Sequence, residues 1–63
     1  MQFIVYSNLS NTIDNVYPIA SFDEFDRAYK YAQSEYASSD TSGSIVEIFN
    51  VSERDVTVTF KRN

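Results

Sequence analysis

The side chains best suited to acid–base chemistry in this sequence are carboxylates, because the chain of 63 residues contains no histidine and no cysteine. Asp23 and Asp26 lie three residues apart and could in principle act as an acid–base pair. They belong to a short polar segment, however, and the surrounding residues show no sign of an enclosing pocket. We therefore expect a protein that is not an enzyme and that has no catalytic residue.

Metal and cofactor sites have equally little support. Without cysteine and histidine the chain lacks thiolate and imidazole ligands. The segment Asp40-Thr41-Ser42-Gly43 lacks the acid spacing of a calcium-binding loop. We expect no metal site and no cofactor.

Tyr31 is the strongest candidate for a binding residue on the predicted helix. It lies off the apolar stripe, with Arg27 one turn before it and Glu35 one turn after it. An exposed tyrosine among charged residues is typical of binding hot spots, although it could also be an ordinary surface residue packed on the Arg27 stem. Together with Glu24, these residues form one predicted group of partner contacts.

Five elements would position these side chains. Ser21 and Glu24 have the spacing of a capping box, which predicts that a helix begins at Ser21. Its apolar stripe, with Phe22 at the margin, should be core and consists of Phe25, Ala28, Tyr29, Ala32 and Tyr36. The helix is expected to end near Ser38, and strands are expected at 2–7, 15–20, 45–51 and 55–61.

The order of the strands follows from their apolar patterns. Residues 3–6 and 45–49 are apolar on both faces, so both belong in the middle of a sheet. Pro18 places the second strand at an edge or at a bulge, and the clean alternation of 55–61 suits the other edge. We predict a single α+β domain over residues 1–63, with ββαββ element order and one helix packed on a four-stranded, mainly antiparallel sheet of order 2-1-3-4. One helix covers one face, so apolar residues remain on the other face.

The register of the last hairpin decides which residues lie on that open face. If a two- or four-residue loop pairs Val51 with Val56, Glu47 lies beneath the helix, together with Ile45, Phe49 and Val51. If a three-residue loop pairs Ser52 with Val56, Val46 and Ile48 lie beneath the helix instead. We prefer the second register because it keeps Glu47 in water. The predicted partner contacts on the open face are then Ile45, Glu47, Phe49 and Val51.

The charge distribution argues against nucleic-acid binding. The net charge is -4, and only Lys61 and Arg62 are adjacent bases. The acids of the helix could instead imitate DNA phosphates, but Asp23 and Arg27 have the spacing of a local ion pair. The sequence contains no pattern of a signal peptide or of a membrane span, so we expect a cytoplasmic protein without membrane contact.

About half of the chain resembles small early bacteriophage proteins that inhibit host machinery, such as phage inhibitors of bacterial RNA polymerase. The resemblance lies in the segment 17–24, with its Asp23-Glu24 pair, in the helical segment 28–36, which ends on Tyr36, and in the strand that follows. In the polymerase inhibitor that last strand carries arginines, whereas residues 45–49 here are Ile-Val-Glu-Ile-Phe. The resemblance therefore implies only a class of protein, and no binding residue is transferred from it.

The leading hypothesis is a non-enzymatic protein-binding module, encoded by a phage, that occludes a surface of a host protein in the host cytoplasm. One alternative is a homodimeric domain of structural or accessory role whose open face is buried between two copies. Another is an acidic protein that mimics DNA.

Overall fold

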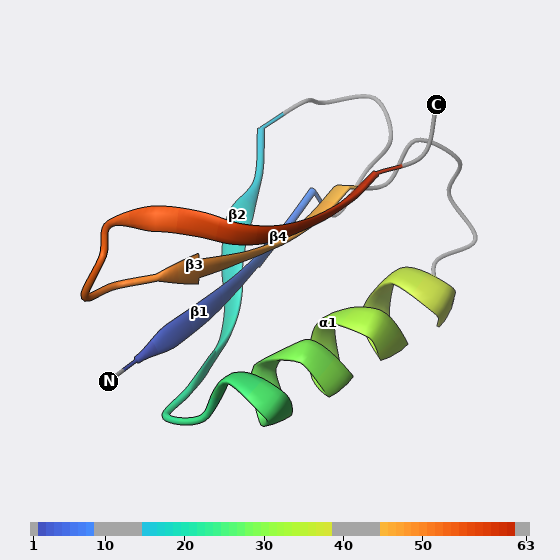
Figure 1. Ribbon diagram of the computed structural model, residues 1–63. Coiled ribbons are helices and arrows are strands. Elements are labelled where there is room, and N and C mark those ends of the chain that lie inside the picture. Colours follow the sequence, from blue (N-terminus) through green and yellow to red (C-terminus); the bar gives the residue numbers. More distant parts are fainter. Residues whose placement is uncertain (1, 9–14, 39–44, 62–63) are drawn as a thin grey trace.

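The computed structural model describes residues 2–8, 15–38 and 45–61, and it shows one helix on one face of an antiparallel sheet (Figure 1). The strands are paired in the order β2-β1-β3-β4. The predicted α+β class, element order and strand order are therefore confirmed. Segment 40–43 and Arg62 lie outside the described residues. The elements are β1 (Phe3–Ser7), β2 (Tyr17–Phe22), α1 (Phe25–Ser38), β3 (Ile45–Asn50) and β4 (Asp55–Lys61).

The start of the helix differs from the prediction. Ser21 belongs to β2, where it pairs with Ile4, and its hydroxyl accepts a hydrogen bond from the Gln2 side chain. The helix begins at Phe25 instead, and the Glu24 carbonyl accepts its first bond from the Ala28 N–H at 3.2 Å. The predicted capping box is wrong because the Ser21 side chain is used in the sheet. The helix ends at Ser38, as expected.

Pro18 has both of the effects that its chemistry predicts. β2 lies at an edge of the sheet, where a missing N–H can face solvent. The ladder also changes register there, because Val5 pairs with Ala20 and Tyr6 with Pro18, which leaves Ile19 as the extra residue of a bulge.

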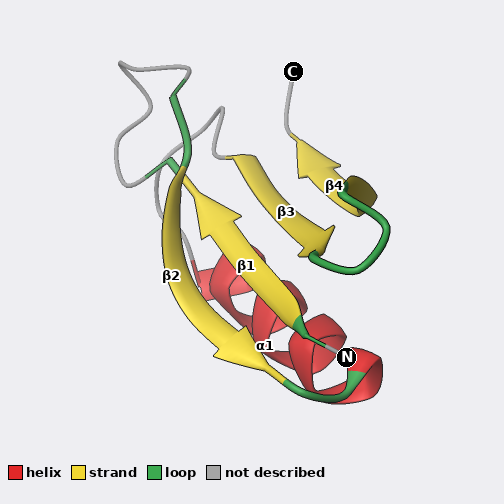
Figure 2. Cartoon of the chain, turned by 90° about the vertical axis from the view of Figure 1, so that its left-hand side faces the viewer, coloured by secondary structure: helices red, strands yellow, loops and turns green. Residues whose placement is uncertain are grey.

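The core lies where α1 crosses the two central strands. The buried alanines Ala28 and Ala32 allow the helix to come close to the sheet. They share the core cluster with Phe3, Val5, Val46 and Ile48. Figure 2 views the molecule from the open side of the sheet, with α1 behind β1 and with β4 to the side of the helix.

Two residues of the predicted helical core are not buried. Phe25 and Tyr29 are each 37% exposed. The helix packs mainly on β1 and β3. Phe25 contacts the ring of Phe3 on β1 and Tyr29 contacts that of Phe60 on β4, but both lie at the margin of the helix–sheet contact and stay partly open to solvent.

The last hairpin turns the predicted side chains of β3 toward the helix, but its turn differs from the prediction. Val46 and Ile48 lie beneath the helix, as expected. A four-residue turn, 51–54, pairs Asn50 with Asp55, and an extra residue in β4 then shifts the register so that Ile48 pairs with Val58. The predicted three-residue loop is wrong, because the bulge rather than the loop length sets which side chains face the helix.

Side-chain bonds support this turn. The buried Asn50 accepts a hydrogen bond from the Glu53 N–H through Oδ1 at 3.2 Å. Thr57 Oγ1 donates to the Ile48 carbonyl at 3.2 Å, across the bulge. Arg54 closes the turn with a φ of 53°, in the left-handed region.

Arg54→Gly should raise the free energy of unfolding by about 1 kcal/mol, because glycine has no Cβ to disfavour the left-handed conformation. Urea unfolding followed by circular dichroism measures the change. Glu53→Gly is the control, because this neighbour in the same turn has no positive φ. It should destabilise the protein, and equal responses of the two variants would contradict the assigned turn geometry.

Candidate functional site

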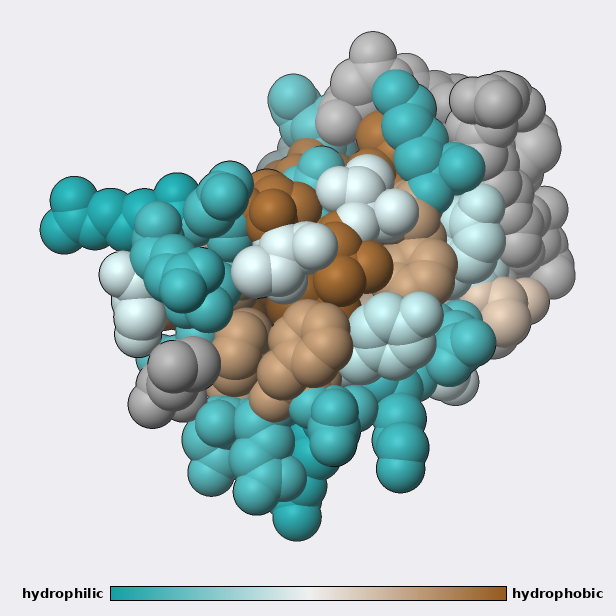
Figure 3. All heavy atoms as spheres, in the orientation of Figure 1, coloured by the Kyte–Doolittle hydropathy of each residue, from teal (hydrophilic) through white to brown (hydrophobic). Residues whose placement is uncertain are grey.

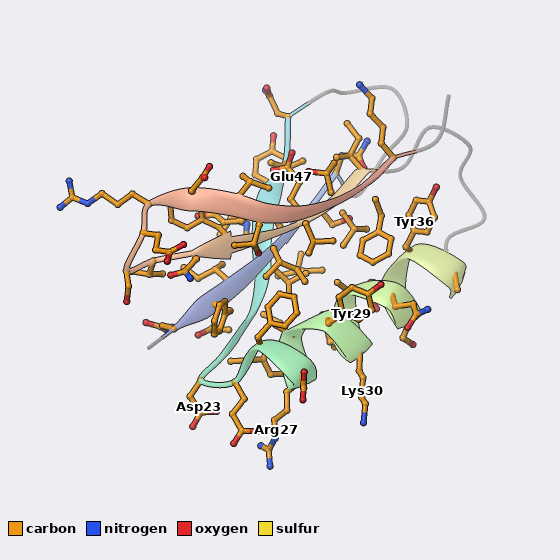
Figure 4. All side chains as sticks on the ribbon, viewed as in Figure 1. Asp23, Arg27, Tyr29, Lys30, Tyr36 and Glu47 are labelled. Atoms are coloured by element: carbon orange, nitrogen blue, oxygen red, sulfur yellow. The ribbon has the colours of Figure 1, made fainter. Side chains whose placement is uncertain are left out.

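The predicted contact residues fall on two opposite sides of the molecule. Arg27 and Lys30 extend from α1 away from the sheet, whereas Glu47 lies on the sheet face opposite the helix (Figure 4). Glu24, Tyr31 and Glu35 belong to the helix side, so they cannot share one flat contact area with Glu47 and Phe49. The structure therefore offers separate candidate surfaces.

Tyr31 is not the exposed residue that its sequence position suggests. It is half-buried and packs against the core cluster, and its ring centroid lies 5.3 Å from that of Phe22. Because β2 continues to Phe22, the edge strand covers this side of the helix as well. The expectation that Tyr31 is exposed is wrong, since helical periodicity does not show where an edge strand ends, whereas its role as a contact residue stays a prediction.

The charged residues of the helix form a weak local pair. Arg27 Nε lies 3.5 Å from Glu24 Oε1, and both side chains are largely exposed, so the pair contributes about 0–1 kcal/mol. Arg27 thus pairs with Glu24 rather than with Asp23. A cation among the first acids of the helix does not favour DNA mimicry, which needs a row of unpaired negative charges. Glu35 is half-buried.

The sheet face opposite the helix carries a compact apolar group. Phe3 and Val5 point into the core, so strand alternation places Ile4 and Tyr6 on the other face. Ile4 pairs with Phe49 and Tyr6 with Glu47 across β1 and β3. We call Ile4, Tyr6, Glu47 and Phe49 the open sheet face. All four are half-buried, and the Tyr6 and Phe49 rings meet edge to face at 6.2 Å and 85°.

Sequence reasoning included Glu47 and Phe49 but missed Ile4 and Tyr6. The sequence did contain a signal for them. Residues 3–6 are apolar on both faces, and pairing of β1 with β3 aligns their outer side chains. Strand order and alternation together could have found both residues.

Ile45 and Val51 differ in what they offer to a partner. Ile45 is only 8% exposed. Its N–H donates a hydrogen bond to Asn8 Oδ1, and its carbonyl accepts one from the Asn8 N–H. The prediction that Ile45 is an exposed contact is wrong. Val51 is 38% exposed in the turn after β3, as expected for a contact residue.

The end of the sheet brings Val51 close to a helix residue. Val51 and Arg27 line the same shallow, open depression, together with Gln2, Ser21, Phe22, Asp23 and Ser52. The depression is not enclosed and exposes charged groups to solvent. It has none of the apolar enclosure typical of small-molecule sites.

Glu47 is the unusual member of the open sheet face. Its cross-strand neighbours are Tyr6 on β1 and Thr59 on β4. Among the residues that the structure describes, Glu47 accepts no hydrogen bond and forms no ion pair. A carboxylate with no partner in the described part of the chain therefore lies beside an aromatic pair.

A second apolar surface lies along the opening between α1 and β4. Figure 3 shows brown and tan side chains gathered there. Four aromatic residues contribute to this surface, and we call them the aromatic strip: Phe25, Tyr29, Tyr36 and Phe60. The Phe60 ring lies 5.7 Å from Tyr29 and 5.4 Å from Tyr36, and Phe25 lies 5.9 Å from Tyr29. Periodicity alone assigned the helical members to the core.

Within the described ranges, no three carboxylates lie close enough together to hold a metal ion. In the same residues, no helix is both long and apolar enough to span a membrane. Comparison with protein-family models, curated proteins and solved structures found no match for this chain. Its function is therefore inferred from its surfaces.

Tyr31→Ala should lower the free energy of unfolding by about 1–2 kcal/mol, because it removes a ring packed on Phe22 and the core. Tyr17→Ala is the control, since Tyr17 is 47% exposed, and it should cost clearly less. Thermal and urea unfolding provide the measurement. Similar losses from the two variants would mean that Tyr31 is as exposed as its sequence position suggests.

Proposed function

We propose that this protein is a non-enzymatic protein-binding module whose open sheet face covers a surface of a partner protein. The observation that carries the proposal is the edge-to-face pair of Tyr6 and Phe49 on the sheet face that α1 leaves uncovered. Aromatic residues are enriched at the centres of protein interfaces and among hot spots.

The open sheet face is suited to binding because its residues are held in place by the sheet. They belong to the two central strands, which pair from Phe3 with Asn50 to Ser7 with Val46. The two rings hold each other in place, so little conformational entropy would be lost on association. Ile4 adds apolar area, and Thr59 and Lys61 on β4 supply a polar rim.

The resemblance to small phage proteins supports a more specific proposal. The partner would be a bacterial host protein, and the bound module would act by occluding one of its surfaces in the host cytoplasm. Blocking a surface needs one complementary face and no catalytic group, and the open sheet face supplies such a face.

Affinity capture from a bacterial extract tests the proposed function. The wild-type chain should retain a stoichiometric partner, and Phe49→Thr should weaken the affinity for it about tenfold or more, as expected for an interface anchor. Threonine is suitable because it keeps the preference for a strand. Tyr17→Thr, at the exposed edge strand, is the control. Equal retention by Phe49→Thr and Tyr17→Thr would refute the open sheet face as the contact.

A second candidate function is self-association, which the aromatic strip favours. Phe25 and Tyr29 are partly exposed, Tyr29 contacts Phe60 on β4, and the outer edge of β4 has no strand partner among the described residues. Two copies could bury these rings against each other. The bulge and the charged ends of β4, Asp55 and Lys61, protect that edge, so self-association ranks second.

Sedimentation equilibrium distinguishes the two candidates. If self-association is the function, the wild-type chain should form a dimer at micromolar concentrations, and Tyr29→Ser should return it to a monomer. Glu53→Ser, at an exposed turn position, is the control and should leave the dimer unchanged. A wild-type monomer at millimolar concentration would exclude this candidate.

A further inference from the structure

We infer that the partner of the open sheet face presents an arginine side chain to Glu47, against the rings of Tyr6 and Phe49. The inference rests on the proposed function, because it names the chemistry of the partner at that same face. Glu47 and the two rings are direct neighbours. Tyr6 lies across from Glu47, Phe49 lies two residues along the same strand, and the rings touch each other.

The first reason is the cost of removing water from a carboxylate. Any protein surface that covers Tyr6 and Phe49 also covers the half-buried Glu47 between β1 and β4. A buried carboxylate without a hydrogen-bond donor or a cation is strongly unfavourable. The partner must therefore bring a group that compensates Glu47, or its binding will be weak.

The second reason is that none of the residues that the structure describes compensates this charge. The residues facing Glu47 from the neighbouring strands are Tyr6 and Thr59, and neither donates a hydrogen bond to it. Among the described residues, Lys61 is a cation on the same sheet face, where it lies across from Ile45. No ion pair joins Lys61 to Glu47. The carboxylate remains available to a cation from outside.

The third reason is that aromatic rings next to a carboxylate favour arginine over lysine. A guanidinium group can donate two parallel hydrogen bonds to a carboxylate while its plane stacks on a ring. A lysine ammonium offers no such fork and is more strongly hydrated. The net charge of -4 would also draw a basic partner surface toward this chain.

Selection from a random 12-residue peptide phage-display library on the immobilised full chain tests the inference. Wild-type protein should enrich arginine-containing peptides that compete with one another for one site. The Glu47→Gln variant should bind the same peptides about tenfold more weakly, because the bidentate charge pair is lost. Glu53→Gln, which removes the same charge from an exposed turn, should bind them like the wild type.

Synthetic versions of one enriched peptide then test the side chain directly. Replacing its arginine by citrulline, which is neutral and of the same shape, should weaken binding by about tenfold, and replacement by lysine should weaken it by a smaller factor. Equal binding of the arginine and lysine peptides would overturn the assignment of arginine. Equal binding of the citrulline peptide would overturn the assignment of a cation.

Two results separate failure of this inference from failure of the proposed function. The enriched peptides are also tested for binding to the Tyr6→Thr and Phe49→Thr variants. If peptides without basic residues bind the wild type and lose binding to these variants, the inference of an arginine is overturned, and the open sheet face remains the binding surface. If no enriched peptide depends on either ring, both proposals fail.

A second copy of this chain is the remaining source of a cation. A dimer seen by sedimentation that is weakened by both Lys61→Gln and Glu47→Gln would show that the partner's Lys61 meets Glu47. That result would overturn the inference of an arginine from another protein. A monomer with intact arginine-peptide binding supports it.

Discussion

The structure depends on the packing of one short helix over the pair formed by β1 and β3. Val5 and Ile48 are directly paired at the centre of the sheet, and neither is exposed. The helix can approach this pair closely because it presents Ala28 and Ala32 there. The chain contains no cysteine and its described residues hold no metal-binding group, so neither disulfides nor described metal sites assist this packing. A helix of 14 residues reaches β4 through Tyr29 and Tyr36, which contact Phe60, but it leaves the opposite face of the sheet uncovered.

Both candidate binding surfaces follow from that limited coverage. The face of β1 and β3 turned away from the helix keeps Ile4, Tyr6 and Phe49 half-exposed beside Glu47. The uncovered side near β4 keeps Phe25 and Tyr29 partly exposed. A small domain has too little core to bury all of its aromatic residues, so the surfaces where they remain are where association would be most favourable.

Glu47 is a charged residue on the open sheet face, whose other members are apolar. An apolar residue at this position would extend the row formed by Ile4, Tyr6 and Phe49, and it would also make the face more prone to aggregation. A carboxylate interrupts this apolar row, and covering it costs free energy unless the covering surface brings a compensating group. Exceptions of this kind to the local pattern are expected at functional sites, where specificity is favoured over stability.

The sequence alone determined the fold class and the strand order. Residues 3–6 and 45–49 must be central because they are apolar on both faces, and Pro18 must lie at an edge because it lacks an N–H. It also indicated that Val46 and Ile48 face the helix. These conclusions depend on periodicity and backbone chemistry, which are local properties of the chain.

Tertiary structure decided the details of the surfaces. It assigned Ser21 to β2 rather than to a helix cap, placed Phe22 against Tyr31, buried Ile45, and used a bulge at Thr57 instead of a shorter loop. Each of these outcomes depends on where two segments distant in sequence meet. Local patterns specify which residues prefer burial, but only the packed sheet and helix determine which of them the limited covered area can accommodate.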